Sequence, residues 1–570
     1  MTQHTERRIL VKIVALAAGL LLAVTTAAGP AAAAPSGDEY RFALLAKAKP
    51  DECFAGVGVP YPAGPPCAGG IKKVNQAYVW GLTRVGSDVW FGTGANVHCL
   101  TSGATLNAIE PVLNDDWVCE YGESQYSKAD AEIPVSVGDM RAPEVWVYNE
   151  RTRRSVNKSA EIRARSADDL YRLKHTIGMR AAGTFKDVVL LGGPSTDQRL
   201  NMFAFDARTK RFLGSHTYDT YGNIRTFLAT RDALYLGVGT GRNGSTGGAV
   251  LRWTGSKRSP FDFVPVGALP VQAADLTLHD GRVAATSWPA EGSGNSAEKL
   301  AGVWLSPPLA DGEPGLNPQD AAGWRQVWNV SRYEPDRVTA ATYGLGGVAS
   351  YGGYLYWGTM HVPTKATKVH QSLFPQTTPE AKQAQIVNTQ RAVSIFRGKN
   401  LGTDQQQVEL LYGSTELPAY RPATASWEMA PTNNNPLNGK SGFGQPFNNY
   451  TWRMAVSGGK LFVGTMDWSY LLHDLLPEPQ DAAAVSRAAA GPDPEQYGGD
   501  LWMFPSPDSP ATAVSTNGVG NNLNYGVRNM IVHGDGLYLG MANPMNLRTD
   551  TTDDIPEGGW ELISMTKSCR

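Results

Sequence analysis

A β-hairpin pattern recurs seven times along this chain and constrains its fold more than any other feature. Each copy has a polar turn followed by a strand-like run of apolar or aromatic residues that ends in a glycine, or in Thr286 in the fourth copy. The copies occupy residues 86–92, 185–192, 231–237, 280–286, 352–358, 458–464 and 534–540. Self-similarity of this kind indicates a repeat architecture, so we number the copies as units one to seven.

A third strand-like run follows each hairpin, and a fourth follows in six of the units. The third runs cover residues 144–148, 201–205, 249–253, 302–305, 393–396, 500–504 and 560–563. Four strands per unit is the blade pattern of a propeller. In this pattern, though in no specific family motif, the repeat resembles the WD40/Kelch-like propellers common among secreted bacterial proteins. We therefore expect an all-β, seven-bladed β-propeller with four antiparallel strands per blade, and a tandem sandwich is the alternative.

The two ends of the repeat region predict how the ring closes. Unit seven lacks a fourth strand, because the chain ends soon after Ile563. Residues 40–45 read as a strand that belongs to no unit of its own. We expect this N-terminal strand to complete the last blade, which covers an otherwise exposed sheet edge. A tandem sandwich would not explain the missing strand.

The first 34 residues have the pattern of a cleaved signal peptide. A basic start, an apolar run over residues 13–24 and small residues up to Pro35 are typical of such a signal, and a membrane anchor is the competing interpretation. No other stretch reaches the 18 apolar residues of a membrane span. We expect a secreted, extracellular protein in which residues 35–570 form a single β-propeller domain.

Cysteine content and charge narrow the classes of partner. The five cysteines of an exported chain indicate disulfides, and we expect the local pairs Cys53–Cys67 and Cys99–Cys119. Cys569 is then unpaired, although its pairing with the N-terminal segment is an alternative. A net charge of −2 shows no basic excess for nucleic acid. We expect a monomer.

Four units carry long loops on what would be the top face of a propeller. These loops cover residues 93–143, 359–392, 465–499 and 541–559, in units one, five, six and seven. These units are consecutive around a closed ring, so their loops are expected to form a wall on one side. The alternative is that loop length varies without functional meaning.

Polar residues recur at matching places in the repeat. The units can be aligned on the glycine that ends their second strand. This alignment gives the same place in the first strand to Arg180, Arg225, Arg453 and Arg528, and Trp80 has that place in unit one. Tyr343, Tyr450 and Tyr525 stand three residues earlier, and His361, Asp467 and Asn543 stand three residues after the glycine. The pattern predicts a top-face pocket on blades five to seven that also includes Trp468. The alternative is that the arginines and tyrosines are packing residues between blades.

The residue types of the predicted pocket favour an anionic ligand that contains a sugar ring. Guanidinium groups bind carboxylates, and aromatic rings provide flat faces for sugar rings. The predicted ligand is an extracellular acidic glycan, bound by Tyr343, Arg453, Trp468, Tyr525, Arg528 and Asn543. His361, Tyr450 and Asp467 are the candidate catalytic residues. A polysaccharide lyase, with His361 or Tyr450 as base, is favoured over a glycoside hydrolase, because hydrolysis requires two carboxyl groups and only Asp467 is well placed.

The same face also fits a non-catalytic module that binds a glycan, a peptide or a protein. The chain has no P-loop, no zinc-ligand motif and no serine-hydrolase elbow. No cofactor is evident, and no metal ligands are assigned. A structural Ca²⁺ is compatible with the Asp and Asn content of the loops, but no motif supports one.

Overall fold

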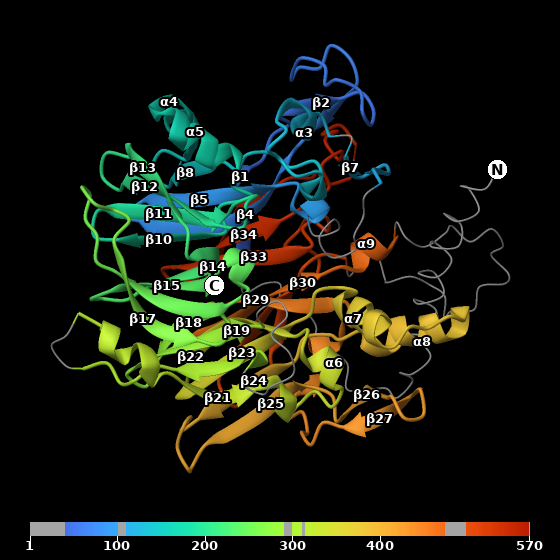
Figure 1. Ribbon diagram of the computed structural model, residues 1–570. Helices are drawn as coiled ribbons and strands as arrows, with labels where there is room; N and C mark the ends of the chain where they lie inside the picture. The colour runs from blue at the N-terminus through green and yellow to red at the C-terminus, as the bar shows by residue number, and fades with distance from the viewer. Residues whose placement is uncertain are drawn as a thin grey trace.

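The computed structural model describes residues 40–100, 110–122, 124–289, 299–310, 314–473, 497–553 and 555–568 (Figure 1). The predicted signal peptide and Cys569 lie outside these residues. None of the described helices is both long and apolar enough to cross a membrane. The described chain is mainly β-structure.

Three of the repeat units form separate antiparallel sheets, each with four strands in sequence order. Unit two consists of β10 (Ala181–Phe185), β11 (Val188–Pro194), β12 (Leu200–Asp206) and β13 (Phe212–Tyr218). Unit three consists of β14 (Tyr221–Ala229), β15 (Leu234–Thr240), β16 (Gly247–Trp253) and β17 (Phe263–Leu269). Unit four consists of β18 (Gln272–His279), β19 (Arg282–Trp288), β20 (Gly302–Leu305) and β21 (Arg325–Asn329).

The other units have the same internal order but are joined into a larger sheet. Unit five has β22 (Gly344–Tyr351), β23 (Tyr354–Met360), β24 (Ile395–Lys399) and β25 (Gln407–Gly413). Unit six has β29 (Asn448–Ser457), β30 (Lys460–Asp467), β31 (Leu501–Phe504) and β32 (Thr512–Ser515). Unit seven has β33 (Gly526–His533), β34 (Gly536–Ala542) and β35 (Glu561–Lys567). Unit one has β4 (Gln76–Val85), β5 (Asp88–Ala95), β8 (Val145–Asn149) and β9 (Arg154–Asn157).

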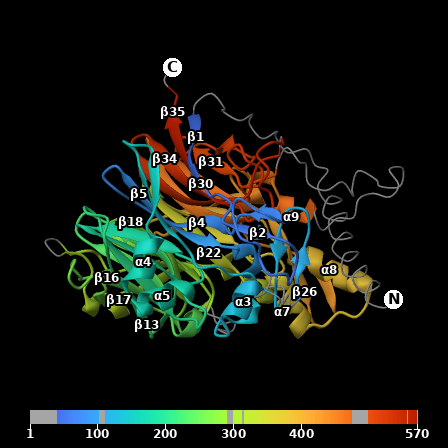
Figure 2. The same cartoon turned by 90° about the horizontal axis from the view of Figure 1, so that it is seen from above.

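The N-terminal strand β1 (Tyr40–Lys47) pairs antiparallel with β35, as the sequence predicts. The register runs from the pair Tyr40–Lys567 to the pair Lys47–Glu561, where the two side chains also form an ion pair of 2.7 Å. Figure 2 shows β1 lying beside β35. Unit seven therefore has four strands, with one of them contributed by the opposite end of the chain.

The first strands of successive units contact one another in a cyclic order. Each first strand contacts the first strand of the next unit, in the order β4, β10, β14, β18, β22, β29 and β33. The last of these, β33, contacts β4 again. The glycine of the repeat is explained by this close packing. A Cβ on Gly464 would lie 2.9 Å from the Cβ of Val527, and one on Gly540 would lie 2.6 Å from a methyl carbon of Val79. Any larger residue at these places would push neighbouring units apart.

Apolar side chains fill the spaces between neighbouring units. Trp90 of unit one packs against Phe205 of unit two with ring centroids 5.2 Å apart, and both are fully buried. Trp328 of unit four contacts Phe396 of unit five at 4.9 Å. Burial of one such ring stabilises the fold by about 2–3 kcal/mol, so each junction contributes substantially.

Short helices and hairpins interrupt the repeat. They are β2 (Glu52–Phe54), β3 (Ile71–Lys73), β6 (Val112–Leu113), β7 (Val118–Cys119), α3 (Gln125–Ala129), α4 (Ser159–Arg165), α5 (Ala167–Lys174), α6 (Arg337–Ala340), α7 (Lys365–Leu373), α8 (Pro379–Thr389), β26 (Glu416–Arg421), β27 (Ser426–Pro431), β28 (Gly439–Lys440) and α9 (Ser469–His473). In Figure 1, α3, α7, α8 and α9 lie on the same side of the molecule. The insertions of units one, five and six thus gather at one end of the strands.

Candidate functional site

The repeated arginines stand at an irregularity of the first strand in their units. In β14 the pairing passes from Ile224 to Thr226 and skips Arg225, and in β33 it skips Arg528 in the same way. Arg180 occupies the corresponding place immediately before β10. A bulge turns a side chain out of the regular alternation of a strand. The recurrence of arginine at this place therefore has a defined backbone setting.

Arg453 does not share this place, so the expected equivalence was wrong by one residue. In β29 the skipped residue is Trp452, and Arg453 pairs directly with Gly464. Thr226 and Asn529 hold the position of Arg453 in their own strands, opposite the equivalent glycines. The side chain of Arg453 consequently has a different environment from those of the other three arginines.

Each of these three arginines lies near the ring of a tryptophan. The distances from guanidinium carbon to ring centroid are 5.4 Å for Arg180 and Trp80, 3.8 Å for Arg225 and Trp288, and 5.7 Å for Arg528 and Trp452. Such cation–π contacts favour a guanidinium group in a site with little water. We call Arg180, Arg225 and Arg528 the arginine cluster.

Three tyrosines connect the tryptophans into a continuous group of rings. The centroid distances are 5.7 Å for Tyr78–Trp80, 5.9 Å for Tyr78–Trp452, 5.8 Å for Trp452–Tyr525, 5.6 Å for Tyr450–Trp452 and 6.4 Å for Trp288–Tyr450. We call these six residues the aromatic belt. Trp468 packs against the same group, although no hydrogen-bond partner reaches its buried Nε1 within the described residues.

No arginine of the cluster forms an ion pair with a carboxylate in the described part of the chain, and Asp275 acts on Arg528 only electrostatically. Arg180 donates one hydrogen bond, of 3.0 Å, to Oδ1 of Asn223, and the buried Nε atoms of Arg180 and Arg225 have no partner there. Arg528 is only 9% exposed. Burial, with repulsion from Arg180 and Arg453, lowers its pKa to about 9. Burial and the two other cluster charges likewise lower the pKa of Arg225 well below its usual value.

Arg453, in contrast, has a carboxylate partner. Its guanidinium donates to Oδ1 of Asp275 and, at 3.3 Å, to Oγ1 of Thr226. Asp275 lies in a second irregular stretch, where the pairing of β18 passes from Ala273 to Leu276. It also accepts a hydrogen bond of 3.0 Å from the Thr226 hydroxyl. The charge of Arg453 is therefore balanced within the protein.

Tyr450, predicted as a catalytic residue, and Tyr525, predicted as a binding residue, both lie near the arginine cluster. The hydroxyl of Tyr450 interacts electrostatically with Arg180, Arg225 and Arg528, which favour its ionised form. Burial outweighs these charges and raises the pKa of Tyr450 above its usual value of 10. Burial also raises the pKa of Tyr525. Both phenols are therefore neutral hydrogen-bond donors near neutral pH.

Tyr343 and His361 belong to a separate buried network in unit five. The Tyr343 hydroxyl donates to Glu334 at 2.7 Å, and Arg391 binds both oxygens of Glu334 at 2.7 and 3.0 Å. The His361 ring packs edge-on against Tyr343, and its Nε2 lies 3.0 Å from the Thr359 hydroxyl. Burial, with Arg391 nearby, lowers the pKa of His361 well below its usual value. Tyr343 is thus occupied by an internal carboxylate.

Asp467 is fully buried beside another carboxyl group. One of its oxygens accepts a hydrogen bond of 2.6 Å from the Ser469 amide, and the other has no partner among the described residues. Burial and the charge of Asp500 raise the pKa of Asp467 well above its usual value. Burial raises the pKa of Asp500 to about 6. Folding therefore favours the protonated form of Asp467.

The place three residues after the glycine is a joint between units. The backbone amides of His361, Asp467 and Asn543 donate to carbonyls of the next unit, at 2.8 Å to Asn449, 2.8 Å to Tyr525 and 2.9 Å to Ala77. The side chain of Asn543 is also engaged internally, since its Nδ2 donates to Glu557 O at 3.0 Å. The recurrence that singled out these three residues thus reflects a backbone contact, while their side chains lie in different networks.

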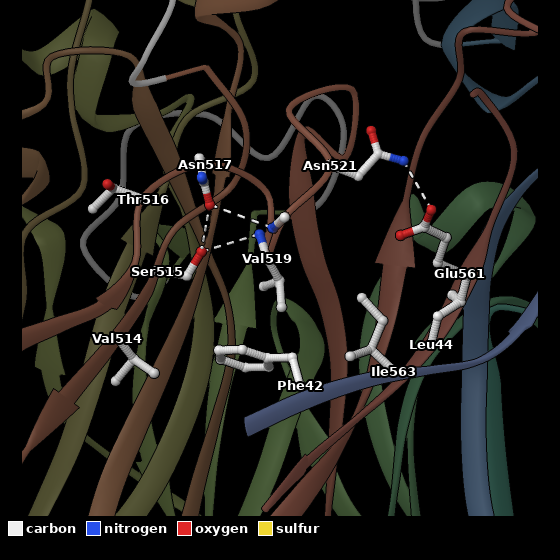
Figure 3. Close-up of a pocket in the computed structure, with 11 residues that line it drawn as sticks. Phe42, Leu44, Val514, Ser515, Thr516, Asn517, Val519, Asn521, Glu561 and Ile563 are labelled. Carbon is white, nitrogen blue, oxygen red and sulfur yellow. Dashed lines mark hydrogen bonds between the residues drawn. The ribbon is translucent and has the colours of Figure 1, made fainter. Parts of the chain in front are cut away.

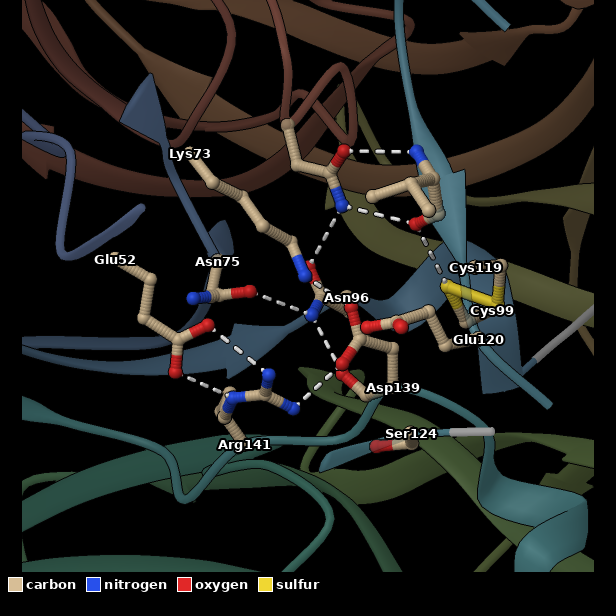
Figure 4. Close-up of polar contacts among 12 residues, drawn as sticks. Glu52, Lys73, Asn75, Asn96, Cys99, Cys119, Glu120, Ser124, Asp139 and Arg141 are labelled. Carbon is tan, nitrogen blue, oxygen red and sulfur yellow. Dashed lines mark hydrogen bonds and ion pairs between the residues drawn. A yellow bond between two sulfur atoms is a disulfide. The ribbon is translucent and has the colours of Figure 1, made fainter. Parts of the chain in front are cut away.

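Both predicted disulfides are present, Cys53–Cys67 and Cys99–Cys119. The second lies beside a mostly buried ion-pair network that joins the unit-one insertion to β2 and β3 (Figure 4). Asp139 pairs with Lys73 and with Arg141, and Arg141 binds both oxygens of Glu52 at 2.7 and 3.0 Å. Asp139, Lys73, Arg141 and Glu52 each have an opposite partner, which indicates that these ion pairs anchor the insertion to strands β2 and β3.

One group of potential metal ligands occurs in the described residues. Asp130, Glu132 and His175 offer ligand atoms within 4.8 Å of one another. The ammonium group of Lys174 already pairs with Asp130 at 2.6 Å. Nothing else indicates a metal at this group, because Glu132 is exposed and the carboxylate of Asp130 is already paired with Lys174.

A surface groove of about 570 Å³ lies elsewhere, between the outer strands of units six and seven (Figure 3). Phe42 and Leu44 of β1, Ile563 of β35 and the segment 514–521 line it. None of the predicted site residues lines this groove. It is therefore distinct from the arginine cluster.

The sequence analysis missed several members of the arginine and aromatic group. Arg180, Arg225 and Trp80 were recognised as equivalent to Arg528 but were left out of the predicted pocket, which was confined to units five to seven. Their equivalence was the signal that could have placed them, because equivalent places on first strands of a ring face the same central space. Trp288 ends β19 and had no repeat signal.

No protein-family model and no curated protein matches the chain. The β-propeller domain of the Trilobed protease from Pyrococcus furiosus is 8% identical, with a TM-score of 0.28 over 77% of this chain and 98% of that chain. A hypothetical selenium-binding protein from Sulfolobus tokodaii is 9% identical, with a TM-score of 0.35 over 75% and 90%. An exo-β-1,3-galactanase from Phanerochaete chrysosporium is 8% identical, with a TM-score of 0.29 over 69% and 71%. Likenesses this distant carry no conclusion about activity.

Proposed function

We propose that residues 35–570 form one seven-bladed β-propeller that acts outside the cell as a monomer. The four-stranded units, the cyclic contacts of their first strands and the β1–β35 pairing support a closed ring. Two disulfides support an oxidising, extracellular location. The insertions gathered on one side support a single loop-bearing face.

We propose that this propeller binds an anionic ligand, an acidic extracellular carbohydrate, at the arginine cluster. The observation that carries the proposal is that three arginines share a mostly buried space without a carboxylate partner among the described residues. Burying an unpaired charge is costly. An anion that enters the cluster would relieve this cost, and the charge-assisted hydrogen bonds would add to its affinity.

The aromatic belt supports a carbohydrate as the carrier of that anion. Its six rings offer apolar faces and three phenol hydroxyls, the combination that suits a sugar ring with its hydroxyl groups. The site differs from the predicted pocket on blades five to seven, because units one, two, three, four, six and seven contribute to it. Tyr525, Arg528 and Trp468 remain binding candidates, and Tyr450, predicted as catalytic, becomes a binding candidate as well. Tyr343, Arg453 and Asn543 are better explained as structural residues.

The binding test compares Arg528→Ala with Arg231→Ala in the exported protein. Arg231 is a matched control because its side chain is 94% exposed and lies outside the cluster. Calorimetric titration with acidic oligosaccharides should show a loss of about tenfold to a hundredfold for Arg528→Ala, because one or more charge-assisted hydrogen bonds are lost. Arg231→Ala should bind like the wild type. Equal affinities for the two variants would reject the arginine cluster as the binding site.

A polysaccharide lyase is the second candidate, and the position of Tyr450 favours it. The arginines could neutralise a uronate carboxylate while the phenolate form of Tyr450, which their charges favour and burial disfavours, takes the proton from the neighbouring carbon and the C–O bond to the leaving sugar breaks. His361 and Asp467 lie in separate networks and are weaker catalytic candidates. Turnover would appear as absorbance of an unsaturated product, lost in Tyr450→Phe and retained in His361→Ala. A Tyr450→Phe protein that binds normally, with no product from the wild type, would favour the non-catalytic module.

A further inference from the structure

We infer that the charged group received by the arginine cluster is a tetrahedral oxyanion, a phosphate or sulfate group, rather than a lone carboxylate. This inference rests on the proposed function, since it names the chemical group that the same site would bind. Three properties of the site support it: its charge, the contribution of its donors by three different units, and the aromatic rings that surround it.

The charge of the site exceeds that of one carboxylate. Arg180, Arg225 and Arg528 act on one another electrostatically, and the carboxylate that acts on Arg528 is Asp275. Asp275 already accepts a hydrogen bond from Arg453. The cluster therefore contains three arginines and no carboxylate of its own among the described residues. A phosphate ester carries about −1.5 to −2 at neutral pH. A sulfate ester, like a carboxylate, carries one negative charge, so the charge of the site favours a phosphate ester, and a sulfate ester is favoured only by its number of oxygens.

The donors of the site come from three different strands. Arg180 precedes β10, Arg225 lies in β14 and Arg528 lies in β33, which belong to units two, three and seven. Each guanidinium lies near an indole ring, and the buried Nε atoms of Arg180 and Arg225 have no hydrogen-bond partner among the described residues. A carboxylate offers two oxygens in one plane, which one or two guanidinium forks satisfy. A tetrahedral ester group offers three outer oxygens that point in different directions.

The surroundings of the cluster strengthen the interaction with a compact anion. The aromatic belt places apolar rings beside the three guanidinium groups, and electrostatic attraction increases in a medium of low dielectric constant. Tyr450 is neutral and interacts with all three arginines, so its hydroxyl is placed to donate to an anion that they hold. Together these residues form a site with four donor groups for a single small anion.

The test measures binding of inorganic phosphate, inorganic sulfate and glucuronate to the exported protein by calorimetry at pH 8 and constant ionic strength. Phosphate and sulfate should each bind at least about tenfold more tightly than glucuronate. Arg528→Lys, which keeps the charge but removes the planar fork, should lose about tenfold in affinity for both oxyanions. Glucose 6-phosphate and glucose 6-sulfate then distinguish the two kinds of ester.

The outcomes separate this inference from the proposed function. The oxyanion inference would be overturned if glucuronate bound as tightly as phosphate and sulfate. If Arg528→Ala also abolished this glucuronate binding, the arginine cluster would still be the binding site. Binding of all the anions that is unchanged in Arg528→Ala relative to Arg231→Ala would overturn both. Absence of binding by all these anions would also overturn both.

Discussion

Arg453 of β29 donates a hydrogen bond to Asp275 of β18, although β22 lies between these strands in the cyclic order. The pair therefore links units four and six across unit five. Room for it comes from β22, whose pairing passes from Leu345 to Val348 and leaves two glycines at the same level. The pair braces the first strands against one another.

Replacement of Arg453 by Met should destabilise the protein by about 3 kcal/mol, because it leaves Asp275 buried without its cation. The double variant Arg453→Met/Asp275→Asn should lose less than the sum of the two single variants. Urea unfolding of the four proteins measures this coupling. Additive losses would show that the pair has no energetic role.

Replacement of Arg528 by Met should have the opposite effect on the ligand-free protein. Removing a buried cation without a carboxylate partner should raise stability by about 1–2 kcal/mol, since the desolvation cost disappears. The increase in melting temperature that phosphate gives the wild type should be absent from this variant. A ligand-free variant that melts well below the wild type would identify Arg528 as a structural residue.

Replacement of Asp467 by Asn should stabilise the protein mainly at high pH. The folded-state pKa values of Asp467 and Asp500 are both raised, so folding favours their protonated forms. That contribution is complete below the ordinary carboxyl pKa of about 4 and declines as the pH rises through about 6, the folded value for Asp500. The gap in melting temperature between variant and wild type should therefore widen from pH 5 to pH 8. A gap that does not change with pH would contradict the buried acid pair.

Replacement of Tyr343 by Phe should leave anion binding unchanged. The hydroxyl of Tyr343 already donates to Glu334, and Arg391 completes that carboxylate's ion pair. The variant should lose about 1–2 kcal/mol of stability, because a hydrogen bond to a charged group is removed. Calorimetry and denaturant unfolding on the same samples separate the two effects. A loss of affinity without a loss of stability would return Tyr343 to the binding site.

Deletion of residues 40–47 should destabilise unit seven by several kcal/mol. Tyr40 alone buries a ring against Phe462, which is worth about 2 kcal/mol, and the edge of β35 becomes exposed. Leu44→Ser is the control, because Leu44 is 57% exposed and the strand is retained. Thermal unfolding of the deletion near the wild-type temperature would contradict the role of β1.

The repeat and its four-stranded units could be predicted from sequence because both depend on local patterns. The turn, the alternating strand and the glycine each follow from neighbouring residues, and the missing fourth strand of unit seven pointed to residues 40–45. The candidate site was harder to predict, because a shift of one residue changes the direction of a side chain. Arg453 and Trp452 are adjacent in sequence, yet Arg453 pairs with an acid while Trp452 joins the aromatic belt.

The roles of polar side chains depended on partners that are distant in sequence. Tyr343, Tyr450 and Tyr525 look alike in the repeat. Only the fold shows that Tyr343 faces Glu334, while Tyr450 and Tyr525 join the aromatic belt. Repeat equivalence therefore predicted the positions of these residues but not their partners.

The pairing of β1 with β35 also sets an order of events during biosynthesis. Lys47 and Glu561, which pair in the folded protein, are 514 residues apart in sequence, so β1 is made first and has no partner until almost the whole chain has been synthesised. Contacts of such long sequence separation form slowly, because a large loop must close first. The other units can assemble while the chain is still emerging, whereas β1 and β35 can pair only in the last step. A chain truncated near its C-terminus consequently leaves β1 as an unpaired strand, available to aggregate or to be cleaved by proteases.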